Sequence, residues 1–346
     1  MKSIRIWLFA AAVLVLSAAG CASFGEQSGN AHTATVFAMD TVMEMTVYGG
    51  SDACARLLDE AGALIRTLEG EFSVTDPASE VYAVNQAGGG PVGPDTEELL
   101  GKALTFCERT GGALDVTVYP VVRAWGFTTG DYRVLTRAEL DALLPLVDWR
   151  KVSLADGAVT LGEGQMLDLG AAAKGYAGDR LIALFREGGV SSAIVNLGGN
   201  VQTLGTKPDG SLWRVAVADP HGNGYAGILE TADRAVVTSG GYERYFEKDG
   251  TVYRHIIDPA TGMPADNGLA SVTVVGKEGL ICDALSTALF VMGEEDALAF
   301  WRASSDFEAV LLTEDGRILL TEGLADIFTP WGDWADAPVT VAGGRP

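Results

Sequence analysis

The sequence has few cysteines, few basic residues and no long apolar run, and each shortage argues against a class of protein. Its four cysteines are Cys21, Cys54, Cys107 and Cys282, and no two form a Cys-x-x-Cys pair, so a zinc site built on cysteine spacing is not expected. With 24 basic against 46 acidic residues, the formal net charge is -22, which argues against a surface for nucleic acid. An anionic ligand would therefore need local help from a metal, a helix N-terminus or a well-placed lysine.

The apolar stretch near the N-terminus has the features of an export signal. Residues 6–16 are apolar, follow the basic residues Lys2 and Arg5, and are too few for a membrane span, which needs roughly 20 residues. Small residues occupy positions 17–20, and Cys21 comes directly after Ala-Ala-Gly, as in a bacterial lipoprotein signal. We therefore expect residues 1–20 to be a signal peptide.

Cys21 is then the expected site of lipidation, with ordinary cleavage near Ala22 and a soluble product as the alternative. The residues that follow are polar and contain Gly, Ser and Asn, so we expect residues 21–34 to be a lipidated tether. The protein would be exported and lipid-anchored to the outer, periplasmic or extracellular, side of a bacterial membrane. With Cys21 used in this way, the other three cysteines allow one disulfide, and the sequence does not say which.

Beyond the tether, helix and strand patterns mix without the regular alternation of a doubly wound sheet. Hydrophobic residues make up 48% of the 346 residues, which is ample for a large core. The spacing predicts helices at 52–69, 96–109, 136–144 and from about Cys282, a strand or hairpin at 35–48, strands near 166–169, 193–197, 213–218, 235–238, 252–257 and 270–275, and a hairpin at 309–321. Thr136 and Glu139 form a capping box, and Asp315-Gly316 is the expected hairpin turn.

These patterns favour an α+β fold with mixed or antiparallel sheets and packed helices. Residues 35–328 contain no linker rich in Pro or Ser and no repeat of fixed period. We therefore predict a single large domain over 35–328, followed by a C-terminal tail over 329–346.

A strand that runs into a helix through small residues is the first candidate for a ligand site. Residues 170–173 are Gly-Ala-Ala-Ala, and the helix is expected to start near Ala172 with Lys174 in its first turn. Free N–H groups at a helix start, together with the charge of Lys174, suit a phosphate or a flavin ring. The segment fits neither of the common glycine-rich nucleotide loops, and a close-packed corner with Lys174 at the surface is an equal alternative.

Asp283 and Thr287 form the second candidate. They are four positions apart, so on a helix they share one face. A carboxylate and a hydroxyl are hard oxygen ligands of the kind that Mg²⁺ accepts, but two side chains are too few for a complete shell. By spacing alone, a helix N-cap at Asp283 and a Thr287 hydroxyl bonded back to the preceding turn is the favoured interpretation.

Three weaker signals complete the set. His255, one of only three histidines, stands at the end of a strand before the turn 258–262, where it would be either a base near neutral pH or a half-buried strand histidine. The pair Gly111-Gly112 leads into an expected strand that carries Asp115. Glycine-rich turns at 196–200 and 239–244 indicate plain hairpin turns when taken alone.

The order of these motifs carries more information than any one of them. Along the chain they are Met39-Asp40-Thr41, then 112–117, 168–176, 196–200, 239–242, 255–262 and 283–287. This series resembles the ApbE family of FAD:protein FMN transferases over about residues 35–325. The resemblance implies that family's own α+β fold.

The resemblance also implies roles for individual residues. Asp283 and Thr287 match the family's metal side chains, and Ala171 matches a metal ligand that acts through its backbone carbonyl. Contacts to FAD are implied for Met39, Ala113, Leu114, Asp115, Asp168, Lys174 and His255. His255 also matches a proposed catalytic histidine, and either His255 or Asp283 belongs to the right chemical class to take a proton from an acceptor hydroxyl.

The implied reaction is Mg²⁺-dependent transfer of FMN from FAD, the substrate, to a Thr or Ser hydroxyl of target proteins, with release of AMP. The implied targets are subunits of membrane redox pumps. Attack on a pyrophosphate needs charge neutralisation and positioning more than covalent help, which suits a metal site in an acidic protein. Two alternatives are hydrolysis of FAD to FMN and AMP, and passive binding of FAD by a lipoprotein.

Overall fold

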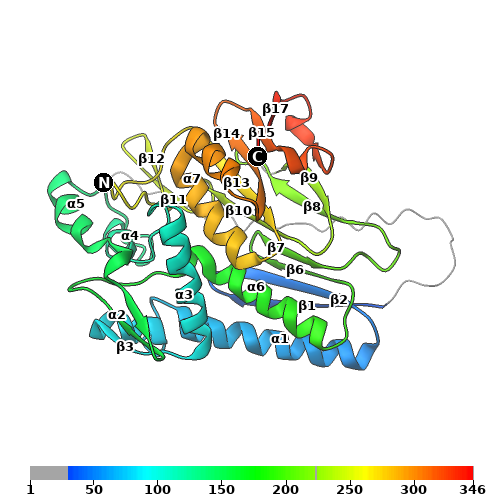
Figure 1. Cartoon of the computed structure of the whole chain (residues 1–346), viewed down its shortest axis with the longest axis horizontal. Coiled ribbons are helices and arrows are strands. Elements are labelled where there is room, and N and C mark those ends of the chain that lie inside the picture. The colour runs from blue at the N-terminus through cyan, green and yellow to red at the C-terminus, as the bar shows by residue number, and fades with distance from the viewer. Residues whose placement is uncertain (1–29, 223, 346) are drawn as a thin grey trace.

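The centre of the molecule is a nine-stranded sheet, seen in the computed structural model, which describes residues 30–222 and 224–345 (Figure 1). In spatial order its strands are β1 (Ala31–Ala38), β2 (Thr41–Tyr48), β6 (Ala193–Leu197), β7 (Asn200–Leu204), β10 (Ala235–Gly240), β13 (Leu269–Gly276), β14 (Phe307–Thr313), β15 (Ile318–Thr321) and β17 (Val339–Ala342). Neighbours are antiparallel throughout except β15 and β17, which are parallel.

Helices cover one face of this sheet and a second small sheet covers the other. The larger helices are α1 (Ser51–Phe72), α3 (Pro94–Arg109), α6 (Gly170–Glu187) and α7 (Gly279–Arg302), and the shorter ones are α2 (Glu80–Ala87), α4 (Tyr119–Trp125) and α5 (Arg137–Leu143). The covering sheet consists of β16 (Phe328–Pro330), β9 (Tyr225–Thr231) and β8 (Trp213–Ala218). Two further small sheets are made of β3 (Gly89–Pro91), β5 (Ala158–Thr160) and β4 (Ser153–Ala155), and of β11 (Tyr245–Lys248) and β12 (Thr251–Arg254).

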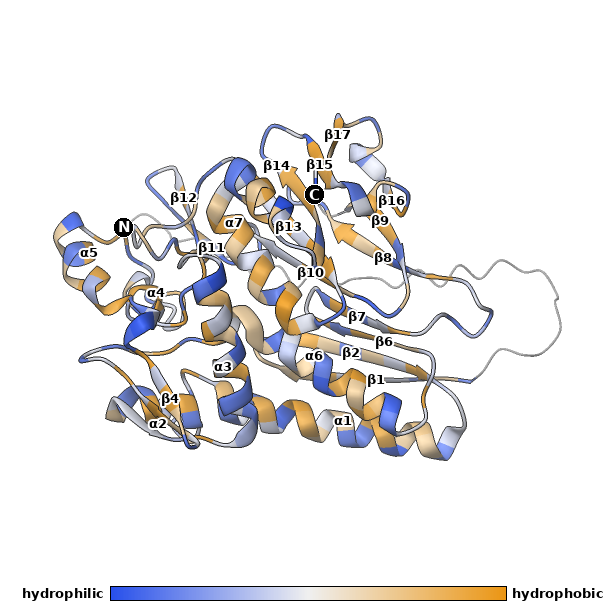
Figure 2. Ribbon diagram, viewed as in Figure 1, coloured by the Kyte–Doolittle hydropathy of each residue, from blue (hydrophilic) through white to orange (hydrophobic). Residues whose placement is uncertain are grey.

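The two covered faces explain why the central strands are apolar on both sides. In β14, Leu311 packs into the core beneath the helices, whereas Val310 and Leu312 pack against the second sheet. Every residue of β6 and β13 is buried for the same reason. The helices also differ in polarity: Figure 2 shows that α7 is mostly apolar, whereas α1 mixes apolar and polar residues.

The structure confirms the α+β class and most of the predicted elements. The helices predicted at 52–69 and 96–109 correspond to α1 and α3, and both halves of the capping box between Thr136 and Glu139 are present at the start of α5. The hairpin of β14 and β15 turns at Asp315-Gly316, where Gly316 has a φ of 82°. Cys54, Cys107 and Cys282 are buried free thiols, so none of the three forms a disulfide.

Several predicted boundaries were wrong. The segment 166–169 is not a strand, because its partners are the Asn85 side chain, which accepts from the N–H of Leu167, and the single carbonyl of Val116. The helix after it, α6, begins at Gly170 rather than near Ala172, α7 begins at Gly279 rather than Cys282, and β12 ends at Arg254 rather than at 257.

The two ends of the domain also differ from the expectation. Strand β1 begins at Ala31, inside the predicted tether, because it pairs with β2 along its whole length. The predicted tail contributes β17, which adds to the sheet beside β15. Cys21 and the predicted signal peptide lie outside the described residues. Among the residues that are described, no helix is both long and apolar enough to cross a membrane.

Candidate active site

A cavity of about 520 Å³ lies where the start of α6, helix α7, strand β10 and the turn between β1 and β2 meet. All ten residues predicted for metal or FAD contacts line it: Met39, Ala113, Leu114, Asp115, Asp168, Ala171, Lys174, His255, Asp283 and Thr287. These residues come from five separate segments of the chain, so the fold brings together what the sequence spreads over almost 250 positions. A cavity of this size is in the range of small-molecule and cofactor sites.

Asp283 is held in the cavity by the neighbouring helix. The N–H of Gly175 in α6 donates to Oδ2 of Asp283 at 2.8 Å. Burial raises the pKa of Asp283, while the charge of Lys174, the backbone N–H of Gly175 and the Asn200 amide act in the opposite direction. Because α7 begins four residues earlier, with Glu278 at the N-cap position, the N-cap interpretation of Asp283 is wrong.

Thr287 lies in a cluster of three hydroxyl groups. Ser239 in β10 has its Oγ 3.2 Å from Oγ1 of Thr287 and 2.7 Å from Oγ of Ser286. The hydroxyl that bonds back along α7 is that of Ser286, which donates to the carbonyl of Asp283 at 2.8 Å. The structure therefore gives Thr287 a partner across the helix–strand contact rather than in the preceding turn.

Ala171 lies in the first turn of α6, where the Asp283 side chain competes with the Ala171 carbonyl for the N–H of Gly175. In a regular helix the N–H of Gly175 would serve the carbonyl of Ala171. Here that N–H also donates to Asp283, and Ala171 itself lines the cavity. Within the described residues no three His, Cys, Asp or Glu side chains gather closely enough to hold a metal by themselves. A metal would need oxygen ligands of other kinds.

His255 is half-buried and packs against the backbone of Arg244. Its N–H and its Nδ1 lie 3.0 and 3.1 Å from the carbonyl oxygen of Arg244, and its ring packs edge-on against Phe127. Since a carbonyl only accepts, Nδ1 carries the proton and Nε2 is left as an acceptor. Burial and the charge of Arg244 lower the pKa of His255 to about 4. His255 is therefore neutral at pH 7, which favours the second of the two alternatives for it, a half-buried histidine with a backbone partner.

Glu243 and Arg244 line the cavity and were not singled out from the sequence. They end the glycine-rich turn 239–244, which predicted only a plain turn, and these two adjacent charges were the available signal. Burial raises the pKa of Glu243 to about 7; the charges of Lys174 and Arg244 lower it and that of Asp283 raises it. Glu243 is thus a carboxyl group in the cavity that changes charge near neutral pH.

This pKa predicts how Glu243 affects stability. Its pKa in the folded state lies above the ordinary value of 4.5, so its stabilising contribution is complete below pH 4.5 and is lost as the pH rises through about 7. In metal-free protein, we expect Glu243→Gln to melt at a higher temperature than the wild type at pH 8 and at a similar temperature at pH 5. Thermal melts at both pH values test this. An equal difference at the two pH values would contradict it.

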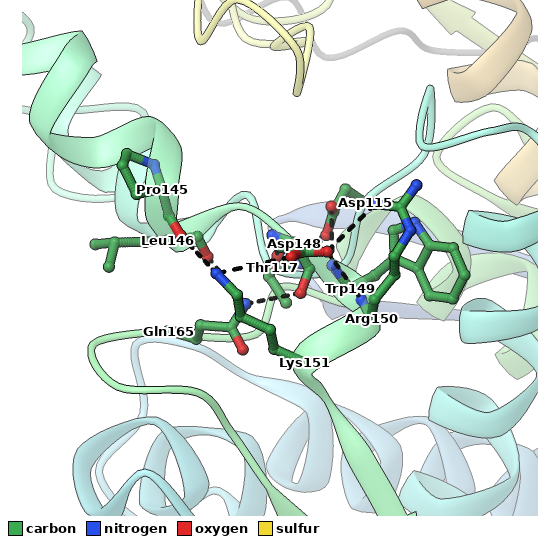
Figure 3. A network of polar contacts seen from close by, with 9 residues as sticks. All are labelled: Asp115, Thr117, Pro145, Leu146, Asp148, Trp149, Arg150, Lys151 and Gln165. Atoms are coloured by element: carbon green, nitrogen blue, oxygen red, sulfur yellow. Dashed lines mark hydrogen bonds and ion pairs between the residues drawn. The ribbon is translucent and has the colours of Figure 1, made fainter.

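Asp115 is used mainly to organise its own loop. Its Oδ1 accepts from the N–H and hydroxyl of Thr117 at 2.8 and 2.6 Å, and its Oδ2 accepts from the N–H of Trp149 at 3.1 Å. Figure 3 shows these bonds within a larger network through Asp148 and Gln165. The predicted strand that carries Asp115 is absent because these bonds fold the chain back into a turn. Ala113 and Leu114 line the cavity from the same loop.

Asp168 stands at the start of α6. Its Oδ1 accepts from the N–H of Gly170 at 2.8 Å, and burial raises its pKa. Together with Lys174, also in the cavity lining, it places both signs of charge at this helix start. The alternative interpretation of the segment, a close-packed corner with Lys174 at the surface, does not hold, because Lys174 lines the cavity.

Met39 and Asp40 form a strained turn at the edge of the cavity. Both have positive φ, 48° and 59°, which is uncommon for residues other than glycine. The N–H of Met39 donates to Oε1 of Glu69 at 2.7 Å, and Asp40 pairs with Arg244 at 3.4 Å. Contacts from α1 and from the segment after β10 thus hold the turn in place. Strain of this kind is typical of functional sites.

The cavity is acidic overall. Its lining includes six carboxyl groups, on Asp40, Glu69, Asp115, Asp168, Glu243 and Asp283, against the two cations Lys174 and Arg244. A diphosphate ligand would be repelled by this lining unless a bound cation entered with it. The acidic lining therefore supports what the net charge of the whole chain indicated, namely that an anionic ligand needs a cation beside it.

Comparison with known proteins places the chain in a family. The sequence profile of the ApbE family matches residues 39–311. A FAD:protein FMN transferase of Treponema pallidum is 33% identical over 351 residues, which cover 94% of this chain and 96% of that protein. A FAD:protein FMN transferase of Klebsiella pneumoniae is 34% identical over 275 residues, covering 77% of this chain and 85% of that protein.

Solved structures agree with the sequence relatives. The ApbE protein of Thermotoga maritima superposes with a TM-score of 0.82 at 31% identity, covering 86% of this chain and 99% of that one. The apo form of the flavinyl transferase ApbE of Pseudomonas stutzeri superposes with a TM-score of 0.76 at 29% identity, covering 84% and 93%. This chain belongs to the ApbE family.

Proposed function

We propose that this protein is an FAD:protein FMN transferase, which moves FMN from FAD to a Thr or Ser hydroxyl of an acceptor protein and releases AMP. The observation that carries the proposal is the placement of Asp283 and Thr287 with Lys174 in one cavity of an ApbE-family fold. The sequence relatives named above carry this activity in their names. Membership of the family makes the chain a flavin transferase, and the details below are inferred from its own residues.

The donor groups in the cavity fit Mg²⁺. The Asp283 carboxylate, the Thr287 hydroxyl and the Ala171 carbonyl are all hard oxygen ligands, and no sulfur or imidazole group is needed among them. Three protein ligands leave room for water and for phosphate oxygens of FAD. When bound, Mg²⁺ would neutralise charge on the diphosphate and on the leaving AMP.

The protein's own groups supply the remaining functions. Lys174, one turn into α6, adds a positive charge to the cavity lining, which favours a phosphate. Neutral His255 offers Nε2 as an acceptor that can orient the attacking hydroxyl. Glu243, with its pKa near 7, is better matched than His255 to take up the proton of that hydroxyl at neutral pH.

The cellular setting is part of the proposal. We propose that Cys21 carries a lipid, that the domain lies on the outer side of the membrane, and that its acceptors are membrane redox-pump subunits. The chain enters the described domain at Ala31, and the turn at Met39 reaches the cavity at the other end of β1. An eight-residue strand spans roughly 26 Å. An anchor before Ala31 would therefore leave the cavity free to receive an acceptor.

The test is a transfer assay with purified domain, FAD, Mg²⁺ and a peptide that contains an acceptor threonine. We expect the peptide to gain the mass of FMN, AMP to appear in equal amount, and both to disappear when EDTA removes the metal. Mass spectrometry of the peptide and chromatography of the nucleotides measure this. A peptide in which valine replaces the threonine is the matched control.

Two outcomes would overturn the proposal. Formation of AMP and free FMN without any gain in peptide mass would make the protein an FAD pyrophosphatase. Intact FAD that stays bound in the presence of Mg²⁺ would make it a passive flavin-binding protein.

A further inference from the structure

Asp179 caps α7 from a different helix. It lies in α6, and its Oδ1 and Oδ2 accept from the N–H groups of Gly279 and Leu280 at 2.6 and 2.9 Å. These are the first two residues of α7, whose own N-cap residue, Glu278, makes no capping bond with its side chain. The orphan donors at the start of α7 are therefore satisfied by a carboxylate 100 positions earlier in the chain.

This cap is one half of a reciprocal contact. Asp179 is one helical turn after Gly175 in α6, and Asp283 is one turn after Gly279 in α7. At one end of the contact Asp179 accepts from Gly279, and at the other end Asp283 accepts from Gly175 at 2.8 Å. Two bonds of opposite direction, one turn apart, fix both the distance between the helices and their register.

The two helices approach so closely here that neither glycine has room for a side chain. A Cβ atom on Gly175 would lie 2.2 Å from the carbonyl oxygen of Gly279, and one on Gly279 would lie 1.7 Å from Nε2 of Gln202. Gln202 itself donates to the carbonyl of Gly175 at 3.0 Å. The backbones of α6 and α7 are thus in direct contact at the point that Asp179 and Asp283 flank.

The charge on Asp179 is costly where it stands. Burial raises the pKa of its carboxyl to about 6, with Glu278 raising it further and Lys102 and the two N–H groups lowering it. At neutral pH the ionised group therefore reduces the stability of the fold relative to a neutral one. Buried charges that destabilise a fold often serve position or function rather than stability.

We propose that Asp179 is a positioning residue, which sets Asp283 and Thr287 on α7 at the correct height against Ala171 and Lys174 on α6. The inference rests on the proposed function, because the two side chains it positions are the proposed metal ligands. Asp179 itself does not line the active-site cavity. Its effect on the reaction would pass entirely through the helix that it caps.

The experiment compares Asp179→Ala and Asp179→Asn with the wild type. Alanine removes both acceptors, whereas asparagine keeps one oxygen for one of the two N–H groups. A second cavity of about 220 Å³ beside Asp179, also lined by Lys102 and Lys277, lets water reach the freed N–H groups, so we expect both variants to fold. Thr136→Ala, which removes the cap of α5, is the matched control because α5 contributes nothing to the active-site cavity.

We expect the Mg²⁺ concentration for half-maximal AMP release to rise roughly 10- to 100-fold in Asp179→Ala, as is usual when support for a metal ligand is lost. Asp179→Asn should lie between alanine and the wild type. The affinity for FAD in EDTA should stay unchanged. In metal-free protein, hydrogen exchange of the amides at 279–283 and at Gly175 should be faster in Asp179→Ala, and unaffected in Thr136→Ala.

Three results would count against the inference. Faster exchange without any change in Mg²⁺ dependence would make Asp179 an ordinary helix cap. Unchanged exchange would mean that it does not hold the contact. A wild type that shows no Mg²⁺-dependent release of AMP would overturn the proposed function and this inference together, whereas the first two results leave the proposed function intact.

Discussion

Asp283→Ala is expected to lower Mg²⁺-dependent turnover of FAD by about 100-fold or more, because loss of a group that merely supports a metal ligand already costs 10- to 100-fold. Asp283 supplies the only carboxylate of the proposed metal shell, and its neighbours Thr287 and Ala171 offer uncharged oxygens. Initial rates of AMP release at several Mg²⁺ concentrations measure the effect. The affinity for FAD in EDTA should change much less than the rate.

The fold should survive this substitution. Asp283 belongs to neither of the large apolar clusters that pack the two faces of the sheet. Asp306→Ala is the matched control, since it removes a carboxylate that pairs with Arg109 outside the cavity and should leave turnover unchanged. If Asp283→Ala keeps Mg²⁺-dependent turnover within about threefold of the wild type, the metal assignment is wrong.

Gly175→Ala should destabilise the protein by roughly 1–3 kcal/mol or more, which is the range for overpacking a close contact. The added methyl group would lie 2.2 Å from the carbonyl oxygen of Gly279 and 2.7 Å from Cβ of Asp283. The first of these atoms belongs to the backbone and the second is the first atom of a side chain, so neither can move aside by a side-chain rotation. Helices α6 and α7 would have to separate, and turnover would fall with the stability.

Gly70→Ala provides the matched control with the opposite sign. Gly70 also lies within a helix, α1, but a Cβ atom there would have no heavy atom within 4 Å. Alanine should stabilise the helix by up to about 1 kcal/mol. Urea unfolding of the two variants measures both effects. A Gly175→Ala protein as stable as Gly70→Ala would mean that the two helices are not in backbone contact.

Local features of this fold could be predicted because the atoms that decide them lie a few positions apart. The capping box of α5 depends on Thr136 and Glu139, and the hairpin turn at Gly316 depends on one glycine with positive φ. The periodicity of α1 and α3 follows from burial of one side of each helix. Elements whose hydrogen bonds come from distant partners were predicted wrongly, such as the segment 166–169, which depends on Asn85.

At the candidate site, too, local features could be predicted from the sequence, whereas contacts with distant residues could not. Spacing alone showed that Asp283 and Thr287 share a helix face, yet it favoured a cap and a back-bonded hydroxyl. The order of the motifs along the chain selected the residues of the cavity through a family resemblance, and the structure brings all ten of them to one cavity. The order of the motifs did not distinguish Asp115 from the other residues of the cavity. The carboxylate of Asp115 already accepts hydrogen bonds from Thr117 and Trp149.

The sequence by itself therefore determined the fold class, most helices and turns, and the residue types at the site, because periodicity and short-range hydrogen bonds are properties of neighbouring residues. Only the tertiary structure decided where those residues lie and what surrounds them. The bond from Gly175 to Asp283 joins positions 108 apart, and the burial that raises the pKa of Glu243 comes from elements far from it in the chain. Such distances and local environments depend on how whole helices and strands pack, which no short stretch of sequence specifies.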